Sequence, residues 1–140
     1  MIEKSKILGV KEIANKYELS SEILITDSGM VLYRVKTLKG FGDVKKGDLG
    51  GYIESEKNLS HEGNCWIYND AWVCDIANVH GNARVYDGAN IYDGASVCNN
   101  ARVYENANVS GESWIYKNAC IYGDANVCDD WIGKNDIACK

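Results

Sequence analysis

The chain has 140 residues, with 15 basic and 20 acidic side chains, six cysteines and no proline, and this length is typical of one small domain. No apolar run approaches the ~20 residues of a membrane span and the N-terminus lacks the apolar stretch of a signal peptide, so we expect a cytoplasmic protein without membrane contact. Residues 61–140 hold 5 basic and 11 acidic side chains, which argues against general nucleic-acid binding, because that binding needs clustered Lys and Arg.

Residues 1–60 predict a capping segment. A loose helical pattern spans residues 10–19, and residues 23–25, 27–29 and 30–38 then indicate a strand, a turn and a longer strand that form a hairpin. Residues 40–51 are glycine-rich but lack the spacing of a phosphate-binding loop. Because repeat folds need covered ends, we expect this segment to cover the first turn of the repeat that follows.

From Cys65 onward the sequence repeats every six residues without an insertion. In each hexad, a small residue, usually alanine, is followed two positions later by a valine or isoleucine. Residues two apart face the same side of a strand, and β-branched residues favour strands, so each hexad predicts a short strand with two inward side chains. Pairs such as Asp87-Gly88 tolerate positive φ and predict corners. The branched positions are Ile67, Val73, Val79, Val85, Ile91, Val97, Val103, Val109, Ile115, Ile121 and Val127.

A second period of 18 residues predicts three strands per turn. Asn64, Asn82, Asn100 and Asn118 recur at this spacing, and we expect them to form left-handed corners and amide ladders. Short strands that stack in parallel on the previous turn satisfy their backbone groups and gather the Val and Ile side chains in a core. We expect this coil over residues 61–130, followed by a C-terminal cap or tail over residues 131–140 in which Trp131 is a lid.

The pattern Ala-x-[Val/Ile]-x-x-[Asn/Gly/Asp] runs without gaps over residues 64–129 and resembles the hexapeptide-repeat family. Residues 41–68 are similar to the segment that opens the β-helix in the YdcK-type members of bacteria, phages and prophages. The resemblance implies an all-β fold, a left-handed parallel β-helix with a small hairpin or helix cap. It also implies a homotrimer and a phage or prophage origin.

The resemblance also implies an enzymatic alternative, acyl transfer from acetyl-CoA. Acyltransferases of this family use a histidine as general base, and the chain offers His80 and His61. His80 falls on a flat outer face without a protruding loop, and His61 falls at the junction with the cap, so we expect neither to be catalytic. With two histidines and no C-x-x-C pair, we expect no metal site.

One outer wall of the predicted coil is the candidate binding surface. Turns ~4.8 Å apart would let tyrosine rings stack on one another and arginines lie against them. Tyr and Arg are favoured at binding surfaces, and arginines in an acidic region suit a small anionic, nucleotide-like ligand. The same residues could instead form only a stabilising ladder or a subunit interface. The two outward columns are Trp66, Arg84, Arg102 and Cys120, and Tyr68, Tyr86, Tyr104 and Tyr122.

The cysteines fall at different heights of the coil. We expect Cys65 to point inward, and Cys74, Cys98, Cys120 and Cys128 to point outward without disulfides or redox function.

The sequence thus predicts a non-catalytic binding or scaffold protein without a cofactor. It would sequester a small anionic ligand or bind a host protein, in the host cytoplasm if phage-encoded. The alternatives are an acyl-CoA-dependent acyltransferase and a purely structural, oligomer-forming protein.

Overall fold

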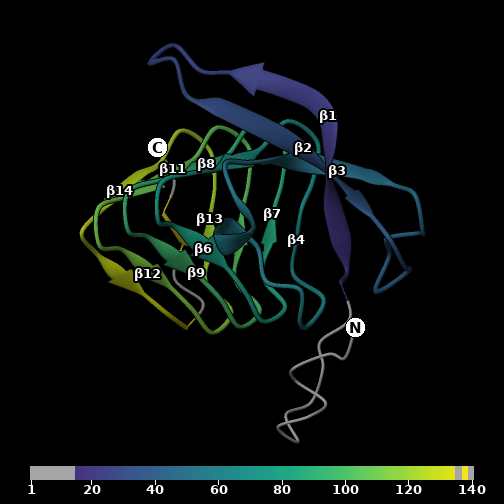
Figure 1. Ribbon diagram of the computed structural model, residues 1–140. Helices are drawn as coiled ribbons and strands as arrows, with labels where there is room; N and C mark the ends of the chain where they lie inside the picture. Colours follow the sequence, from purple (N-terminus) through teal and green to yellow (C-terminus); the bar gives the residue numbers. More distant parts are fainter. Residues whose placement is uncertain (1–14, 135–136, 139–140) are drawn as a thin grey trace, which may run out of the picture.

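A computed structural model describes residues 15–134 and 137–138 of the chain (Figure 1). The described regular structure is β-strand, apart from one 3-10 turn, η1 (Glu56–Asn58). Three longer strands come first, β1 (Tyr17–Ile25), β2 (Val31–Thr37) and β3 (Leu49–Ile53). Strands of two or three residues follow: β4 (Trp66–Ile67), β5 (Trp72–Val73), β6 (Asn78–Val79), β7 (Arg84–Val85), β8 (Asn90–Ile91), β9 (Ser96–Val97), β10 (Arg102–Val103), β11 (Asn108–Ser110), β12 (Trp114–Ile115), β13 (Cys120–Ile121), β14 (Asn126–Cys128), β15 (Trp131–Ile132) and β16 (Ile137–Ala138).

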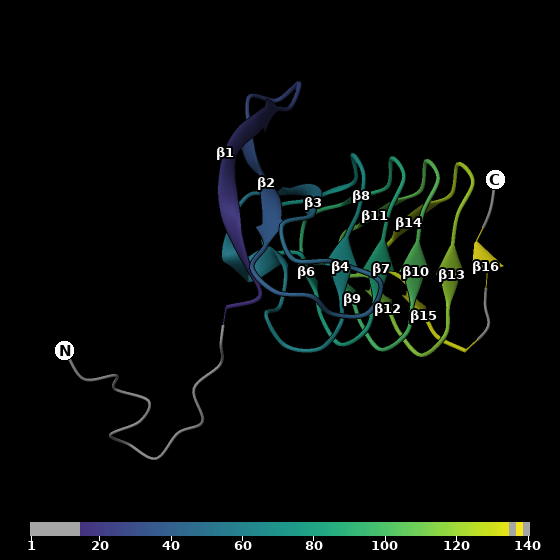
Figure 2. The same cartoon turned by 90° about the vertical axis from the view of Figure 1, so that its right-hand side faces the viewer.

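The short strands form a β-solenoid of about four turns, which confirms the predicted architecture. Every third strand pairs in parallel with the strand one turn away, so that Arg84 lies beside Arg102 and Val85 beside Val103, 18 residues apart. Figure 2 shows these turns stacked along one axis. The three walls have the strand orders β3-β5-β8-β11-β14, β4-β7-β10-β13-β16 and β6-β9-β12-β15.

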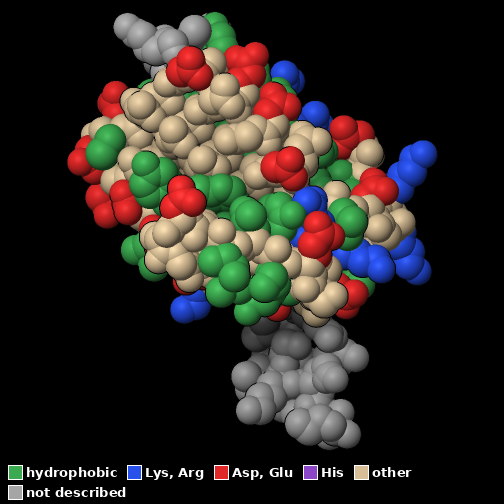
Figure 3. Space-filling view, turned by 90° about the horizontal axis from the view of Figure 1, so that it is seen from above, with side chains coloured by type: hydrophobic (Ala, Val, Ile, Leu, Met, Phe, Trp, Pro, Cys, Tyr) green, Lys and Arg blue, Asp and Glu red, His purple; other side chains and the backbone are tan. Residues whose placement is uncertain are grey.

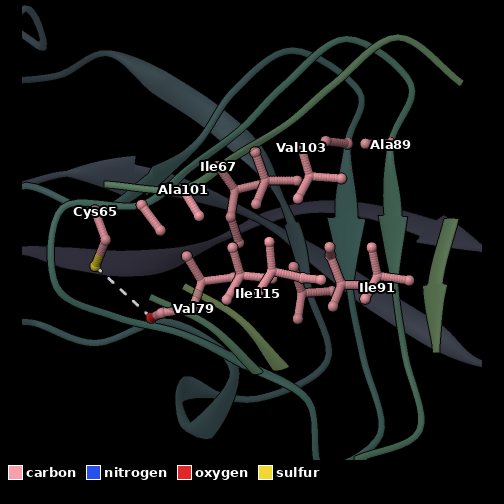
Figure 4. Packing of buried hydrophobic residues seen from close by; sticks show 14 of the residues in the cluster. Cys65, Ile67, Val79, Ala89, Ile91, Ala101, Val103 and Ile115 are labelled. Carbon is pink, nitrogen blue, oxygen red and sulfur yellow. Dashed lines mark hydrogen bonds between the residues drawn. The ribbon is translucent and has the colours of Figure 1, made fainter. Parts of the chain in front are cut away.

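The core is built from the inward positions of the hexads (Figure 4). Each branched position from Ile67 to Val127 is at most 6% exposed, and the alanines two positions earlier are at most 2% exposed. A small and a branched side chain from each strand fill the narrow interior at the close packing typical of proteins.

The corners are built from residues with positive φ whose side chains support the next turn. Asp87 has a φ of 58°, and its carboxylate accepts a hydrogen bond of 3.1 Å from the Glu105 backbone N–H, 18 residues later. The side-chain oxygen of Asn99 likewise accepts a hydrogen bond of 2.9 Å from the Lys117 backbone N–H. The predicted left-handed role of Asn64, Asn82, Asn100 and Asn118 is wrong, because the preceding residues have the positive φ: Gly63, Gly81, Asn99 and Lys117.

The N-terminal strands continue one wall beyond the first turn. β1 and β2 form the predicted hairpin, and β2 pairs antiparallel with β3, which joins β5 in parallel. The helix expected over residues 10–19 is wrong for residues 17–19, which belong to β1, and residues 10–14 lie outside the described residues. Long-range pairing with β2, Leu19 beside Val35 for example, overrides the local helical pattern.

The first turn is closely fitted to this hairpin. Ile53 and Leu59 lie beside Val73 and Val79, at a spacing of 20 residues instead of 18. Gly51 permits the close approach, since a Cβ atom there would lie 2.3 Å from the Ala71 carbonyl oxygen.

Buried donors satisfy the carbonyl groups that face the cap. The Lys16 ammonium, 1% exposed, donates to the carbonyl oxygens of Cys65 at 2.8 Å and Gly63 at 3.2 Å. The Asn58 amide donates to the Ala77 carbonyl at 2.7 Å. These side chains take the place that the N–H groups of a preceding turn would occupy.

At the other end, the coil continues past residue 130. β15 pairs in register with β12, and β16 pairs with β13. The lid expected at Trp131 is wrong, because Trp131 lies beside the outward Trp114 and is 66% exposed. None of the helices in the described part of the chain is long and apolar enough to cross a membrane.

Candidate functional site

The β4-β7-β10-β13-β16 wall brings the predicted arginines and tyrosines together on its outer surface. Arg84 and Arg102 are direct neighbours in the parallel ladder, with Cys120 next in line. On this wall a tyrosine follows each of the branched inward residues from β4 to β13, and these tyrosines form a continuous column. Tyr86 and Tyr104 stack with ring centroids 4.9 Å apart, and Tyr104 and Tyr122 stack at 5.4 Å. Tyr68 meets Tyr86 edge-on at 6.1 Å.

Trp66 is not part of this surface, and its assignment to the binding site is wrong. It is 1% exposed and packs edge-on against Tyr17 and Phe41, at centroid distances of 6.1 and 5.3 Å. The alternation of the strand does turn Trp66 outward, but the segment before the repeat covers the first turn there. Period alone could not reveal this long-range cover.

The two arginines line a hollow of about 240 Å³, which we call the arginine hollow. The residues around it are Asp43, Tyr68, Asn69, Arg84, Tyr86 and Arg102. Sequence analysis missed Asp43, which comes from the glycine-rich segment and accepts a hydrogen bond of 3.0 Å from the Tyr68 hydroxyl. Only its acidic character in an irregular loop could have drawn attention to it.

The electrostatics of the hollow are set by burial and by the neighbouring charges. Burial, and then the hydrogen bond and charge of Asp43, raise the pKa of Tyr68 to about 12. Burial also raises the pKa of Tyr86, while the nearby Arg102 acts in the opposite direction. Both phenols therefore remain neutral donors at physiological pH.

The guanidinium groups of the hollow have no carboxylate partner within the described residues. Arg84 is half-buried and Arg102 is exposed. The ion pairs of the described residues join Arg34 to Glu22 and Asp70, and His61 to Glu56. Arginine stacking on a ring was predicted for this wall, but it is Arg34 that lies over a tyrosine, with Cζ 4.3 Å from the Tyr52 ring centroid.

The two histidines lie away from the arginine hollow. His61 stacks on Tyr17 with centroids 4.2 Å apart. Its Nδ1 accepts the Lys16 backbone N–H at 3.0 Å, and its Nε2 lies 2.7 Å from Glu56 Oε1. His80 is exposed at the end of β6. His61 thus joins parts of the cap, and His80 stands on an open surface.

The cysteines of residues 15–134 are free thiols. Cys65 is buried in the core as predicted. Cys74 and Cys98, which we expected to point outward, are only 3% and 4% exposed because other side chains cover them. Cys74 packs in a small cluster with Leu32 and Tyr52, and Cys98 Sγ accepts the Trp114 indole N–H at 3.2 Å. No group of His, Cys, Asp or Glu in the described ranges could hold a metal ion.

The sequence is similar to part of one curated protein. "Uncharacterized acetyltransferase YdcK" of Escherichia coli (strain K12) is 38% identical over 61 residues, which cover 39% of this chain. The matched part is 19% of the relative, so the chain spans about a fifth of its length. No protein-family model matches the sequence. The chain is therefore a β-solenoid that resembles one stretch of a protein named as an acetyltransferase.

Proposed function

We propose that this chain is a non-catalytic binding module of the hexapeptide-repeat type that takes a small anionic, nucleotide-like ligand in the arginine hollow. The observation behind this proposal is the pair of adjacent guanidinium groups, Arg84 and Arg102, without carboxylate partners in the described chain. Guanidinium groups bind phosphate and carboxylate oxygens through paired N–H donors. The Tyr86 phenol supplies a neutral donor beside them, whereas the Tyr68 hydroxyl donates to Asp43.

The geometry favours binding over catalysis. The hollow holds no imidazole, because His61 is engaged in the cap and His80 stands on the open surface. A general base must lie within hydrogen-bond reach of the proton that it removes. Ligand retention by a rigid wall needs no such group.

Titration calorimetry with a panel of adenine and guanine nucleotides and inorganic phosphate tests the proposal. We expect Arg84→Ala/Arg102→Ala to weaken binding about tenfold or more for each arginine, since hydrogen bonds to charged groups contribute about 1.5–3 kcal/mol. Lys45→Ala/Lys46→Ala removes two exposed positive charges outside the hollow and is the matched control. Equal affinities for the arginine variant and the native protein would refute the site.

A second candidate is an acyl-CoA-dependent acyltransferase, supported by the printed name of the E. coli relative. It predicts protection against thermal unfolding by acetyl-CoA, and loss of turnover in His80→Ala or His61→Ala. His61→Ala also disturbs the cap, so His80→Ala is the sharper variant.

We also propose that the chain forms homotrimers, and that a host protein is the alternative partner if the gene is phage-borne. Native mass spectrometry would give the number of subunits and identify any small molecule that copurifies. A scaffold without a ligand would give defined oligomers and no binding in the nucleotide panel.

A further inference from the structure

The described cations of the repeat lie along one side of the solenoid. In residues 61–134 the basic side chains are Arg84, Arg102, Lys117 and Lys134, and each of them lines one of three hollows on or beside the β4-β7-β10-β13-β16 wall. With the exception of Glu62, the acidic side chains of these residues lie at the other two corners of the coil. In a region with excess negative charge, this separation marks an electropositive strip, with Asp43 from the preceding loop at its arginine end.

The three hollows share residues and so form one continuous surface. The arginine hollow shares Arg84 and Arg102 with a second hollow of about 310 Å³, which also includes Asn82 and Asn100. Those two amides also line a third hollow of about 640 Å³, together with Asn118, Lys117 and Lys134. The third hollow follows the corner between the β6-β9-β12-β15 wall and the arginine wall, which faces the viewer in Figure 2.

The chemistry changes along this strip. One end carries Arg84 and Arg102 beside the Asp43 carboxylate, and the other end carries Lys117 and Lys134. The amides between the two ends can donate to and accept from hydroxyl groups. Lys117 precedes Cys120, the ladder neighbour of Arg102, by three residues, so the lysine lies one corner and one turn away from Arg102. A ligand that uses the whole strip therefore has anionic groups at both ends and neutral hydroxyl groups between them.

The tyrosine column favours a sugar chain over a single-stranded nucleic acid. Nucleic-acid strands gain much of their affinity from bases that stack on free aromatic faces. Tyr104 is stacked on Tyr86 on one side and on Tyr122 on the other, so its faces are already covered.

We propose that the strip from Arg84 and Arg102 to Lys117 and Lys134 binds an extended anionic glycan. The inference rests on the proposed function, because the arginine hollow forms one end of the strip. It adds a second cationic end and an amide-lined middle, which a mononucleotide would leave empty.

Tetragalacturonate and galacturonate, measured by titration calorimetry, test the length of the site. Lys117→Asn/Lys134→Asn removes both distal charges and suits the backbone, since both residues have positive φ, 55° and 62°, which Asn tolerates. We expect this variant to bind tetragalacturonate about two- to thirtyfold more weakly, from 0.2–1 kcal/mol for each exposed charge pair. Galacturonate affinity should not change, and Lys45→Ala/Lys46→Ala should match the native protein for both sugars.

Each contrary result has a distinct meaning. If the native protein does not bind tetragalacturonate, or if the asparagine variant binds it equally well, the extended glycan site is refuted while the arginine hollow can still pass the nucleotide test. If Arg84→Ala/Arg102→Ala leaves nucleotide binding intact, the proposed function fails by its own criterion. Tighter, lysine-dependent binding of an oligothymidylate of equal charge would overturn the glycan in favour of a nucleic acid.

Discussion

Replacement of Lys16 by methionine should open the cap of the solenoid. The Lys16 ammonium donates to the Cys65 and Gly63 carbonyls and lies 4.7 Å from the centroid of the Phe41 ring. Methionine keeps most of the apolar stem, but it leaves both carbonyl groups without this donor. The perturbation therefore isolates the polar contacts of the cap from its packing.

The size of the effect follows from two opposing contributions. A buried acceptor left without a partner costs about 1–3 kcal/mol, and two acceptors are affected. Burial lowers the pKa of Lys16, which shows that the ammonium is itself held at a cost that methionine removes. We expect a net loss of about 2–4 kcal/mol in the free energy of unfolding, or a Tm lower by about 6–15 °C for a chain of this size.

Urea unfolding followed by tryptophan fluorescence and circular dichroism measures this loss. Trp66, buried beneath Tyr17 and Phe41, should report the cap directly. Lys57→Met removes an exposed lysine and should change stability by less than about 0.5 kcal/mol. If Lys16→Met is as stable as Lys57→Met, the Lys16 contacts do not hold the cap, and the reasoning is refuted.

Three further predictions concern the close contacts and the thiols. Gly51→Ala should destabilise the chain by about 2 kcal/mol or more, because the new Cβ atom would collide with the Ala71 carbonyl. Gly88→Ala is the control: its Cβ atom would lie 3.5 Å from the nearest neighbour, so thermal unfolding should be almost unchanged. Alkylation followed by mass spectrometry should modify the exposed Cys128 well before the buried Cys74; equal rates would contradict the burial. Burial also raises the pKa of Cys74 to about 12. The free energy of unfolding should therefore fall as the pH rises above 9, by less than about 1.4 kcal/mol per pH unit. Urea titrations at pH 8 to 11 should show a flatter fall for Cys74→Ala.

The inward residues of the repeat could be predicted because one rule governs all of them. A strand of two or three residues can bury a side chain only on one face, so a period of six with a small and a branched residue leaves a single arrangement. Ile91 and Ala89 are fully buried, as the pattern requires. The positions of the corners also followed from sequence, since Asp87 and Asn99 tolerate the positive φ that they adopt.

The outward residues could not be predicted with the same certainty, because their burial depends on distant segments. Trp66 lies under Tyr17 and Phe41, and Cys98 lies beneath Trp114. Residues 17–19 of β1 escaped prediction for the same reason, since their strand conformation depends on pairing with β2. Alternation gives the side to which a residue points, whereas the cover over that side is a property of the whole chain.

The arginine ladder carries an electrostatic cost for folding. Arg84 and Arg102 are direct neighbours on adjacent strands, and like charges in this position destabilise a sheet. Neither arginine has an ion-pair partner among the described residues that would offset this repulsion. Arg102→Gln should therefore leave the free energy of unfolding unchanged or raise it by up to about 1 kcal/mol, while it weakens anion binding. A clear loss of stability in this variant would instead assign the arginine to the fold, and the electropositive strip would lose its functional meaning.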